Sequence, residues 1–237
     1  PLGHSFSKAY FTKKFKAEKI DAEFVNFASN NIEQTLQVIK TTPSLKGFAV
    51  TIPYKEKIIP YLDHISEEAK EIGAVNSVKV EHTRSGSILT GYNTDCTGFL
   101  HAVRDFPLGG RVLLLGCGGV GRMMATEAVL HGADLTIGIL ERHIPMAKTF
   151  LEELQELVPE ASVRYALTAE LDEPFDLVLN STPVGMYPKV DAMPLTESLL
   201  QQCGAVFDAI YNPTETKLIQ TAKAMGKPVC GGAAMLV

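Results

Sequence analysis

"RVLLLGCGGVGRMMATEAVL", residues 111–130, is the stretch that decides the expected fold. An apolar run meets a loop with four glycines, Gly116, Gly118, Gly119 and Gly121, and a helix-like segment follows directly. In the spacing G-x-G-x-x-G the first glycine permits a tight turn, the second lets a pyrophosphate approach the backbone, and the last lets helix and strand pack closely. Free N–H groups of the helix then face the phosphates. The order strand, loop, helix predicts a dinucleotide-binding unit, against the alternative of a glycine-rich turn without a ligand.

The rest of the chain alternates short β-branched runs with helix-like segments, which predicts an α/β fold with largely parallel sheets. The expected strands are 22–28, 47–52, two within 76–94 joined by a polar turn, 111–116, 133–140, 162–167, 175–181 and 204–210. The expected helices are 7–20, one from residue 31, one beginning near Lys55, 67–75, and 216–226 with Gly226 just after its end. Continuous apolar runs in the second half predict strands that are buried on both faces of a parallel sheet.

The segment RDFPLGG, residues 104–110, carries proline and glycine before a new apolar strand, so we place a domain boundary there. We expect residues 1–103 to form a first α/β domain and residues 104–227 to form a second, Rossmann-like domain with a parallel sheet. Residues 228–237 are expected near the interface. Two domains joined in this way predict a cleft that closes around a substrate.

Composition and charge narrow the class of protein. The 237 residues are 46% hydrophobic and 21% charged, which is typical of a globular protein with a sizeable core. A formal charge of −5 argues against nucleic acid as a partner, because phosphate backbones attract basic surfaces. The four cysteines show no C-x-x-C pair and no His/Cys metal spacing, so we expect no metal and a cytoplasmic protein. No apolar run is long enough to cross a bilayer, and no membrane partner is expected.

The strand at 133–140 is followed by Glu141, Arg142 and His143. In dinucleotide-binding folds a carboxylate at this point accepts from the ribose 2′-OH and favours NAD, whereas an arginine holds a 2′-phosphate and favours NADP. Both residue types are present, so these positions by themselves leave the choice of cofactor open. Arg142 could equally be a solvated loop residue.

Several polar residues of the first domain could carry chemistry or could be structural. Ser5 and Ser7 could cap the first helix, or could present two hydroxyls to an anion at its N-terminus. Lys55 lies at an expected helix start, where the dipole disfavours a cation; it could be needed for chemistry or could be a surface lysine, as most lysines are. Asp95 could be a helix cap, and Asn76 a turn residue.

Taken together and in order, these segments resemble the shikimate dehydrogenase family. The resemblance covers nearly the whole chain and rests on PLGHSFSKAYF, VTIPYKE, IGAVNSV, GYNTDCTGF, LLLGCGGVG, DLVLNSTPVGM, VFDAIYNPTETKLI and GGAAMLV. It implies a substrate-binding catalytic domain at 1–103 and an NADP-binding Rossmann domain at 104–227. The implied reaction is the reversible NADPH-dependent reduction of 3-dehydroshikimate to shikimate, a step in aromatic amino-acid biosynthesis.

The resemblance also implies roles for single residues. Lys55 and Asp95 would form the catalytic pair beside the reacting C3 oxygen, where an ammonium stabilises the charge that hydride delivery builds and can supply the proton. Which of the two is the formal acid–base stays open, because close pairs titrate as a unit. The implied substrate-binding residues are Ser5, Ser7, Thr51, Asn76 and Tyr211. The implied cofactor-binding residues are Gly116, Gly118, Gly119, Val120, Gly121, Glu141, Arg142, Ser181, Thr182, Met186, Gly232 and Met235.

The sequence also fits other functions. The family pattern after the second cofactor strand is Asn-Arg-Thr, and here it reads Glu141-Arg142-His143. Arg142 favours NADP, whereas Glu141 could repel a 2′-phosphate or accept from a 2′-OH. The competing hypotheses are an NAD-using quinate/shikimate dehydrogenase, a non-catalytic nucleotide-binding sensor of the same fold, and a group-transfer enzyme such as a methyltransferase. The expected partner is a small molecule, shikimate or 3-dehydroshikimate, and the expected state is monomer or homodimer.

Overall fold

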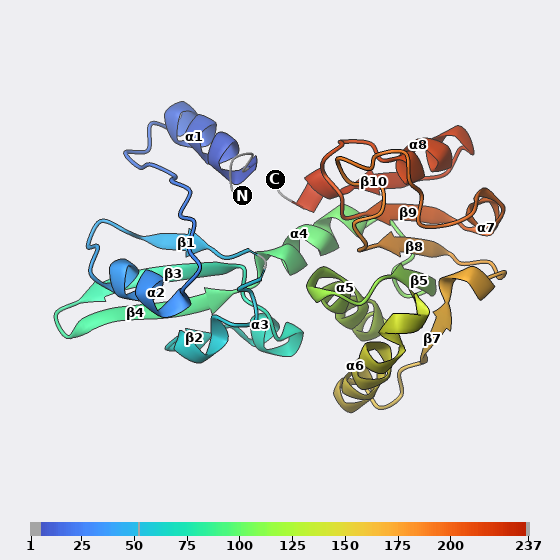
Figure 1. Cartoon of the computed structure of the whole chain (residues 1–237), viewed down its shortest axis with the longest axis horizontal. Helices are drawn as coiled ribbons and strands as arrows, with labels where there is room; N and C mark the ends of the chain where they lie inside the picture. The colour runs from blue at the N-terminus through green and yellow to red at the C-terminus, as the bar shows by residue number, and fades with distance from the viewer. Residues whose placement is uncertain (1–5, 52, 236–237) are drawn as a thin grey trace.

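The computed structural model describes residues 6–51 and 53–235, which form two lobes with the helix α4 (Thr94–Val103) between them (Figure 1). In the described residues the first lobe has a four-stranded sheet in the order β1-β3-β4-β2. Its elements are α1 (Phe6–Glu18), α2 (Ile32–Lys40), β1 (Gly47–Ala49), the 3₁₀ helix η1 (Ile59–Tyr61), β2 (His64–Ile65), α3 (Glu67–Ile72), β3 (Ser77–Thr83) and β4 (Gly86–Tyr92).

The second lobe has a fully parallel sheet in the order β10-β9-β8-β5-β6-β7. Its strands are β5 (Arg111–Leu115), β6 (Asp134–Ile139), β7 (Val163–Leu167), β8 (Leu177–Asn180), β9 (Ala205–Asp208) and β10 (Val229–Gly231). Its helices are α5 (Gly119–Leu130), η2 (Glu141–His143), α6 (Ile144–Leu157), η3 (Thr168–Glu170), α7 (Glu197–Gln202), α8 (Lys217–Ala224) and η4 (Gly232–Met235). Counted from β5, this is the strand order of a dinucleotide-binding sheet, with the topological switch between β5 and β8.

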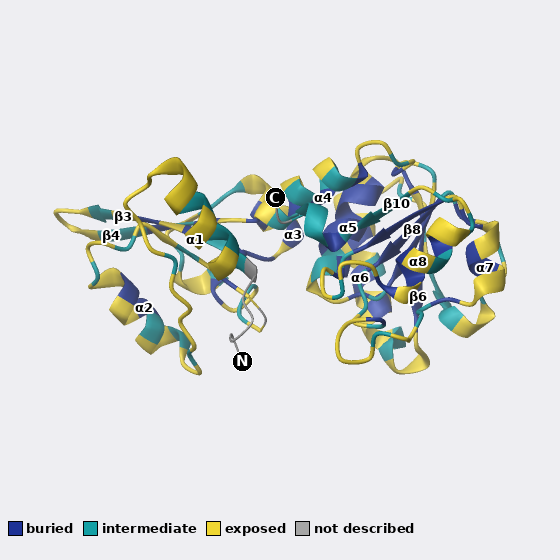
Figure 2. Cartoon of the chain, turned by 90° about the horizontal axis from the view of Figure 1, so that it is seen from above, coloured by how far each residue is buried: buried dark blue, intermediate teal, exposed yellow. Residues whose placement is uncertain are grey.

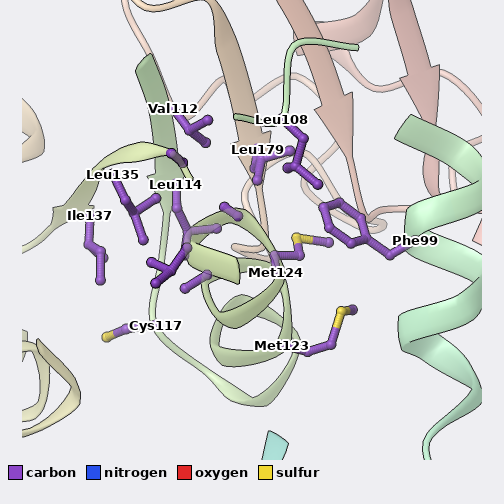
Figure 3. Close-up of a cluster of buried hydrophobic side chains, with 14 of the residues drawn as sticks. Phe99, Leu108, Val112, Leu114, Cys117, Met123, Met124, Leu135, Ile137 and Leu179 are labelled. Carbon is purple, nitrogen blue, oxygen red and sulfur yellow. The ribbon is translucent and has the colours of Figure 1, made fainter. Parts of the chain in front are cut away.

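The core of the second lobe follows from the alternation of side chains along β5. Val112 and Leu114 lie in one buried cluster with residues of α4, α5 and α6, whereas Leu113 and Leu115 lie in another with residues of α7 and α8. Figure 3 shows the first of these clusters, with Val112 and Leu114 beside Met124. Because the two clusters contain residues of different helices, helices cover both faces of the sheet, which explains the continuously apolar run. Burial is concentrated in this lobe (Figure 2).

Helix α4 packs into the core of the second lobe through Cys96, Phe99 and Val103. The ring of Phe99 lies edge-on to that of Phe207 on β9, with centroids 5.4 Å apart. A side chain at Gly98 would clash with the backbone carbonyl of Met235, so this glycine lets η4 lie directly on α4. The domain boundary between residues 103 and 104 stays a prediction.

Two predictions of secondary structure for the first lobe are wrong. Residues 22–28 form no strand; most of this segment is exposed, and Phe24 stacks on Phe11 of α1, with ring centroids 5.2 Å apart, instead of joining the sheet. Lys55 begins no α-helix, because its carbonyl accepts from the N–H of Val75 (2.8 Å) and is not used by a following helical turn. Lys55 therefore lies in a run of turns before η1.

The first sheet also differs from the largely parallel arrangement that was expected. Strands β3 and β4 form an antiparallel hairpin, as predicted for 76–94, and β1 is antiparallel to β3, so β2–β4 is the one parallel pair among the described strands of this sheet. The strand predicted at 47–52 is shorter and ends at Ala49. The remaining predicted helices and strands are present, and Gly226 has the positive φ of 72° expected just after α8.

Candidate active site

An ion pair between Lys55 and Asp95 lies at the junction of the first lobe and α4. The Lys55 Nζ is 2.5 Å from Asp95 Oδ2, and each side chain is 22% exposed. The two residues are 40 positions apart in the chain. A lysine and a carboxylate in contact, partly shielded yet open to solvent, can bind an oxygen atom and move a proton to or from it.

Asp95 is placed by the start of α4. Asn93 caps this helix: its Oδ1 accepts from the N–H groups of Asp95 (3.1 Å) and Cys96 (3.3 Å), and its Nδ2 donates to the carbonyl of Ala74 (3.0 Å). Asp95 lies in the first turn, where the helix dipole favours an anion. Asn93 was not among the predicted site residues, although an asparagine before T-D-C-T is a typical cap signal.

Asn76 connects the same start of α4 to the sheet. Its Oδ1 accepts from the N–H (2.8 Å) and from the hydroxyl (3.1 Å) of Thr94, and its carbonyl accepts from the N–H of Val50 (2.7 Å). Thr51 follows directly and is exposed, and its carbonyl accepts from the N–H of Tyr54 at 2.9 Å. The structure thus brings Thr51, Lys55, Asn76 and Asp95 to one region, while their roles toward a substrate stay a prediction.

The glycine loop has the geometry that the motif requires. Gly116 has φ of 89°, and a Cβ at Gly121 would lie 2.6 Å from Ser181 Oγ and 2.7 Å from the Gly116 carbonyl oxygen. Apart from the adjoining residues and the nearby backbone of α5, a Cβ at Gly118 or Gly119 would meet no described atom within 4 Å. These two residues therefore form an open face at the N-terminus of the 12-residue helix α5, which suits a pyrophosphate.

The segment after β6 reaches the same edge of the sheet as the glycine loop. Strands β5 and β6 are parallel with Leu115 opposite Gly138, so Glu141, Arg142 and His143 follow at the carboxyl edge as η2. Arg142 and Glu141 are exposed, and Arg142 Nε donates to His143 Nε2 at 3.3 Å. An acidic and a basic group are both available here to a ribose or a 2′-phosphate.

The segment after β8 lies across the switch point from the glycine loop. Ser181 donates both its N–H (3.0 Å) and its hydroxyl (2.7 Å) to the carbonyl of Leu115. These two hydrogen bonds connect the residue after β8 to the end of β5. Thr182 donates its N–H (3.0 Å) and hydroxyl (2.7 Å) to Asn180 Oδ1. Met186 is 45% exposed on the loop that follows.

The other predicted site residues differ in how the structure places them. Tyr211 lies in the loop after β9 and is 48% exposed. Gly232 donates its N–H to the carbonyl of Ile210 (3.2 Å), and a side chain there would clash with the carbonyl of Ala209, so close packing requires this glycine. Ser7 lies on α1, which stands apart from the sheet, and Ser5 lies outside the described residues (Figure 1).

A thiol follows Asp95 directly and faces the second lobe. Cys96 is 4% exposed, and its Sγ donates to Oε1 of the buried Glu127 on α5 at 2.9 Å. Burial, followed by the hydrogen bond to Glu127, raises the pKa of the Cys96 thiol to about 12. The thiol therefore acts as a donor between α4 and α5 and not as a nucleophile.

No described helix is both long and apolar enough to cross a membrane, and the described residues contain no group of three metal-ligating side chains. All four cysteines are free thiols.

Residues 1–78 match the family described as the shikimate dehydrogenase substrate binding domain. The whole chain aligns with the shikimate dehydrogenase (NADP(+)) of Clostridium beijerinckii at 35% identity, over 84% of that protein. Among solved structures, the shikimate 5-dehydrogenase of Thermus thermophilus in complex with NADP(H) and shikimate is 30% identical, with a TM-score of 0.82. The match spans all of this chain and 85% of the Thermus thermophilus chain. The quinate dehydrogenase of Corynebacterium glutamicum in complex with NAD is 26% identical with a TM-score of 0.83, again over all of this chain and 86% of the other.

Proposed function

The chain belongs to the shikimate dehydrogenase family, and we propose that it catalyses the reversible NADPH-dependent reduction of 3-dehydroshikimate to shikimate. One observation carries the proposal: Lys55 and Asp95 meet at 2.5 Å beside the junction of the lobes, although 40 positions separate them in the chain. In this proposal the residues up to 103 bind the substrate and residues 104–227 bind the cofactor.

The residues at the edge of the parallel sheet fit a dinucleotide. The open glycine face at the start of α5 would hold the pyrophosphate, and Glu141 and Arg142 would hold the adenosine ribose and its phosphate. Thr182 and Met186 lie on the far side of the switch point, where the nicotinamide half would bind. NADPH, when bound, supplies the hydride.

The chain's own contribution to the chemistry is charge and a proton. As the carbonyl becomes an alkoxide, negative charge develops on the C3 oxygen, and the Lys55 ammonium stabilises that charge and supplies the proton. Asp95 holds the ammonium in place through the ion pair and shares the proton with it. In the reverse direction the pair accepts the proton of the shikimate hydroxyl. Thr51, Asn76, Tyr211, Ser5 and Ser7 would orient the ring and its carboxylate.

Lys55→Ala tests this role, with Lys57→Ala as the matched control, because Lys57 is an exposed lysine of the same turn region. We expect Lys55→Ala to lower turnover by about two to four orders of magnitude with little change in NADP⁺ affinity. Lys57→Ala should turn over normally. The assay follows reduced-nicotinamide absorbance after addition of shikimate and NADP⁺, and unchanged turnover in Lys55→Ala would refute the assigned role.

A second candidate is an NAD-using quinate/shikimate dehydrogenase, which the carboxylate of Glu141 at the end of β6 favours. Steady-state kinetics with both cofactors and both substrates separate the two functions. A strong preference for NAD together with quinate turnover would replace the first proposal. A non-catalytic nucleotide sensor would show binding without any turnover. We also propose a cytoplasmic location, which the four free thiols support.

A further inference from the structure

A fully buried carboxylate lies at the carboxyl end of β9. Asp208 is 0% exposed and accepts three hydrogen bonds from neutral donors. Its Oδ1 accepts from Asn180 Nδ2 (3.0 Å) and from the N–H of Ile210 (3.0 Å), and its Oδ2 accepts from the hydroxyl of Thr216 (2.6 Å). Asn180 and Thr216 are themselves 0% and 1% exposed.

The first partner of Asp208 leads to the loop after β8. Asn180 donates its amide to Asp208, and its Oδ1 accepts from both the N–H and the hydroxyl of Thr182. The Thr182 hydroxyl in turn accepts from the N–H of Val184 at 3.2 Å. A continuous chain of hydrogen bonds therefore runs from the carboxylate to the loop that carries Thr182 and Met186.

The other two partners lead to the loop after β9. Ile210, whose N–H donates to Asp208, directly precedes Tyr211 in the chain. Thr216 caps α8, because its hydroxyl oxygen accepts from the N–H of Ile219 at 3.3 Å. The two loops also meet each other, because the N–H of Tyr187 donates to the carbonyl of Asn212 at 3.1 Å. The Asp208 carboxylate is thus hydrogen-bonded to residues at the end of β8, at the start of the loop after β9, and at the start of helix α8.

We propose that Asp208 is a positioning residue, which holds the loops bearing Thr182 and Tyr211 in the geometry that binds the nicotinamide half of the cofactor and the substrate. This inference rests on the proposed function. Asp208 touches neither ligand directly in this scheme, because its side chain is fully buried and its hydrogen bonds go to the three donors described.

The chemical character of the site supports a role beyond stability. A buried carboxylate without a cation is costly, and an apolar side chain would fill such a position at lower cost. Burial outweighs the three hydrogen bonds and raises the pKa of Asp208 above its ordinary value. A costly buried group whose partners lie at the end of β8, in the loop after β9 and at the start of α8 is expected where geometry, and not folding energy, is required.

The test compares Asp208→Ala and Asp208→Asn with Val206→Ala as the control. Val206 lies on the same strand two residues away, is 0% exposed and packs in the apolar cluster with α7 and α8, so its truncation destabilises the same region without touching the loops. In Asp208→Asn the amide oxygen can still accept from Asn180 and Ile210, and the amide nitrogen can donate to Thr216 Oγ1. This variant should therefore recover part of the loss.

Two measurements distinguish a positioning role from a general loss of stability. The first is the calorimetric affinity for NADP⁺ and for 2′,5′-ADP. The second is steady-state kinetics with shikimate, in which kcat and KM are determined separately. Because 2′,5′-ADP occupies only the adenosine end, Asp208→Ala should bind it normally while losing about ten- to hundredfold in NADP⁺ affinity and in kcat/KM. Val206→Ala should lower the melting temperature and leave both affinities unchanged.

Any of the following results would overturn the inference. One is a folded Asp208→Ala that keeps NADP⁺ affinity and kcat/KM within about twofold of wild type; another is an equal loss in Val206→Ala. Should Asp208→Ala not fold, Thr216→Val removes the hydroxyl that donates to Asp208, together with the acceptor for the N–H of Ile219, and normal NADP⁺ affinity in that variant would likewise refute positioning. A wild-type chain that fails to bind NADP⁺ would overturn the proposed function itself, and with it this inference.

Discussion

Gly121→Ala and Gly119→Ala should have opposite effects on the stability of the protein, although the two glycines are only two residues apart on α5. A methyl group at Gly121 would lie 2.6 Å from Ser181 Oγ and 2.7 Å from the Gly116 carbonyl oxygen. A methyl group at Gly119 would meet no described atom within 4 Å other than those of the adjoining residues and the nearby backbone of α5. Neither glycine has a positive φ, so backbone strain does not enter the comparison.

The magnitude follows from the difference between the variants. Both replacements gain helix propensity, which is worth up to about 1 kcal/mol for Gly→Ala within a helix. Only Gly121→Ala must also move packed atoms, at a cost of about 1–3 kcal/mol. Because 1 kcal/mol corresponds to about 2–4 °C in a chain of this size, Gly121→Ala should melt about 2–12 °C below Gly119→Ala.

Cofactor affinity should separate the variants in a different way. The methyl group of Gly119→Ala stands on the open face at the start of α5, where the pyrophosphate is proposed to bind. Loss of one hydrogen bond to a charged group costs about 1.5–3 kcal/mol, which weakens NADP⁺ binding about ten- to hundredfold. The assays are thermal unfolding and calorimetric titration with NADP⁺. The reasoning is wrong if Gly121→Ala melts at or above Gly119→Ala, or if Gly119→Ala binds NADP⁺ as wild type does.

Three further predictions concern titratable side chains. In the native protein at pH 8, iodoacetamide should leave Cys96 unmodified until the chain is unfolded, because the thiol is buried and its pKa is about 12; peptide mass spectrometry showing rapid native labelling would contradict this. Glu141→Asn should raise the affinity for NADP⁺ relative to NAD⁺ about two- to fivefold, as expected for removal of one exposed like charge, and a calorimetric ratio that falls instead would show that Glu141 does not face the 2′-phosphate. The raised pKa of Asp208 means that its contribution to stability is fully present below its unfolded value of 3.8 and is lost as pH rises through the folded value. Wild type should therefore lose stability relative to Asp208→Asn as pH rises above 4 in urea unfolding, and a constant difference would refute this.

Much of the second lobe could be predicted because its signals are local. Gly116 needs a positive φ and Gly121 needs close approach, and both requirements are written in the spacing of the loop. The strand order around β5 follows from repeated strand–helix units in which every strand is parallel. Asp208 was missed, although an aspartate inside the apolar run GAVFDAI was a signal that a buried polar group lay there.

The first lobe was harder to predict because its pairings are not local. The segment 22–28 has the composition of a strand, but it stacks on α1 through Phe24 and joins no described strand. Lys55 was expected on a helix, yet its carbonyl is taken by Val75, a residue 20 positions further along the chain. Local propensity cannot reveal which distant N–H will claim a given carbonyl.

The amino-acid sequence by itself determined the α/β alternation, the glycine loop, and, through the order of its motifs, the family. Only the tertiary structure decided that the Lys55 ammonium lies 2.5 Å from the Asp95 carboxylate, and that Asp208 holds two loops at once. The physical reason is range. Backbone torsion and helix–strand periodicity act over a few residues, whereas an ion pair or a buried hydrogen-bond network depends on where packing brings segments that the chain itself keeps far apart.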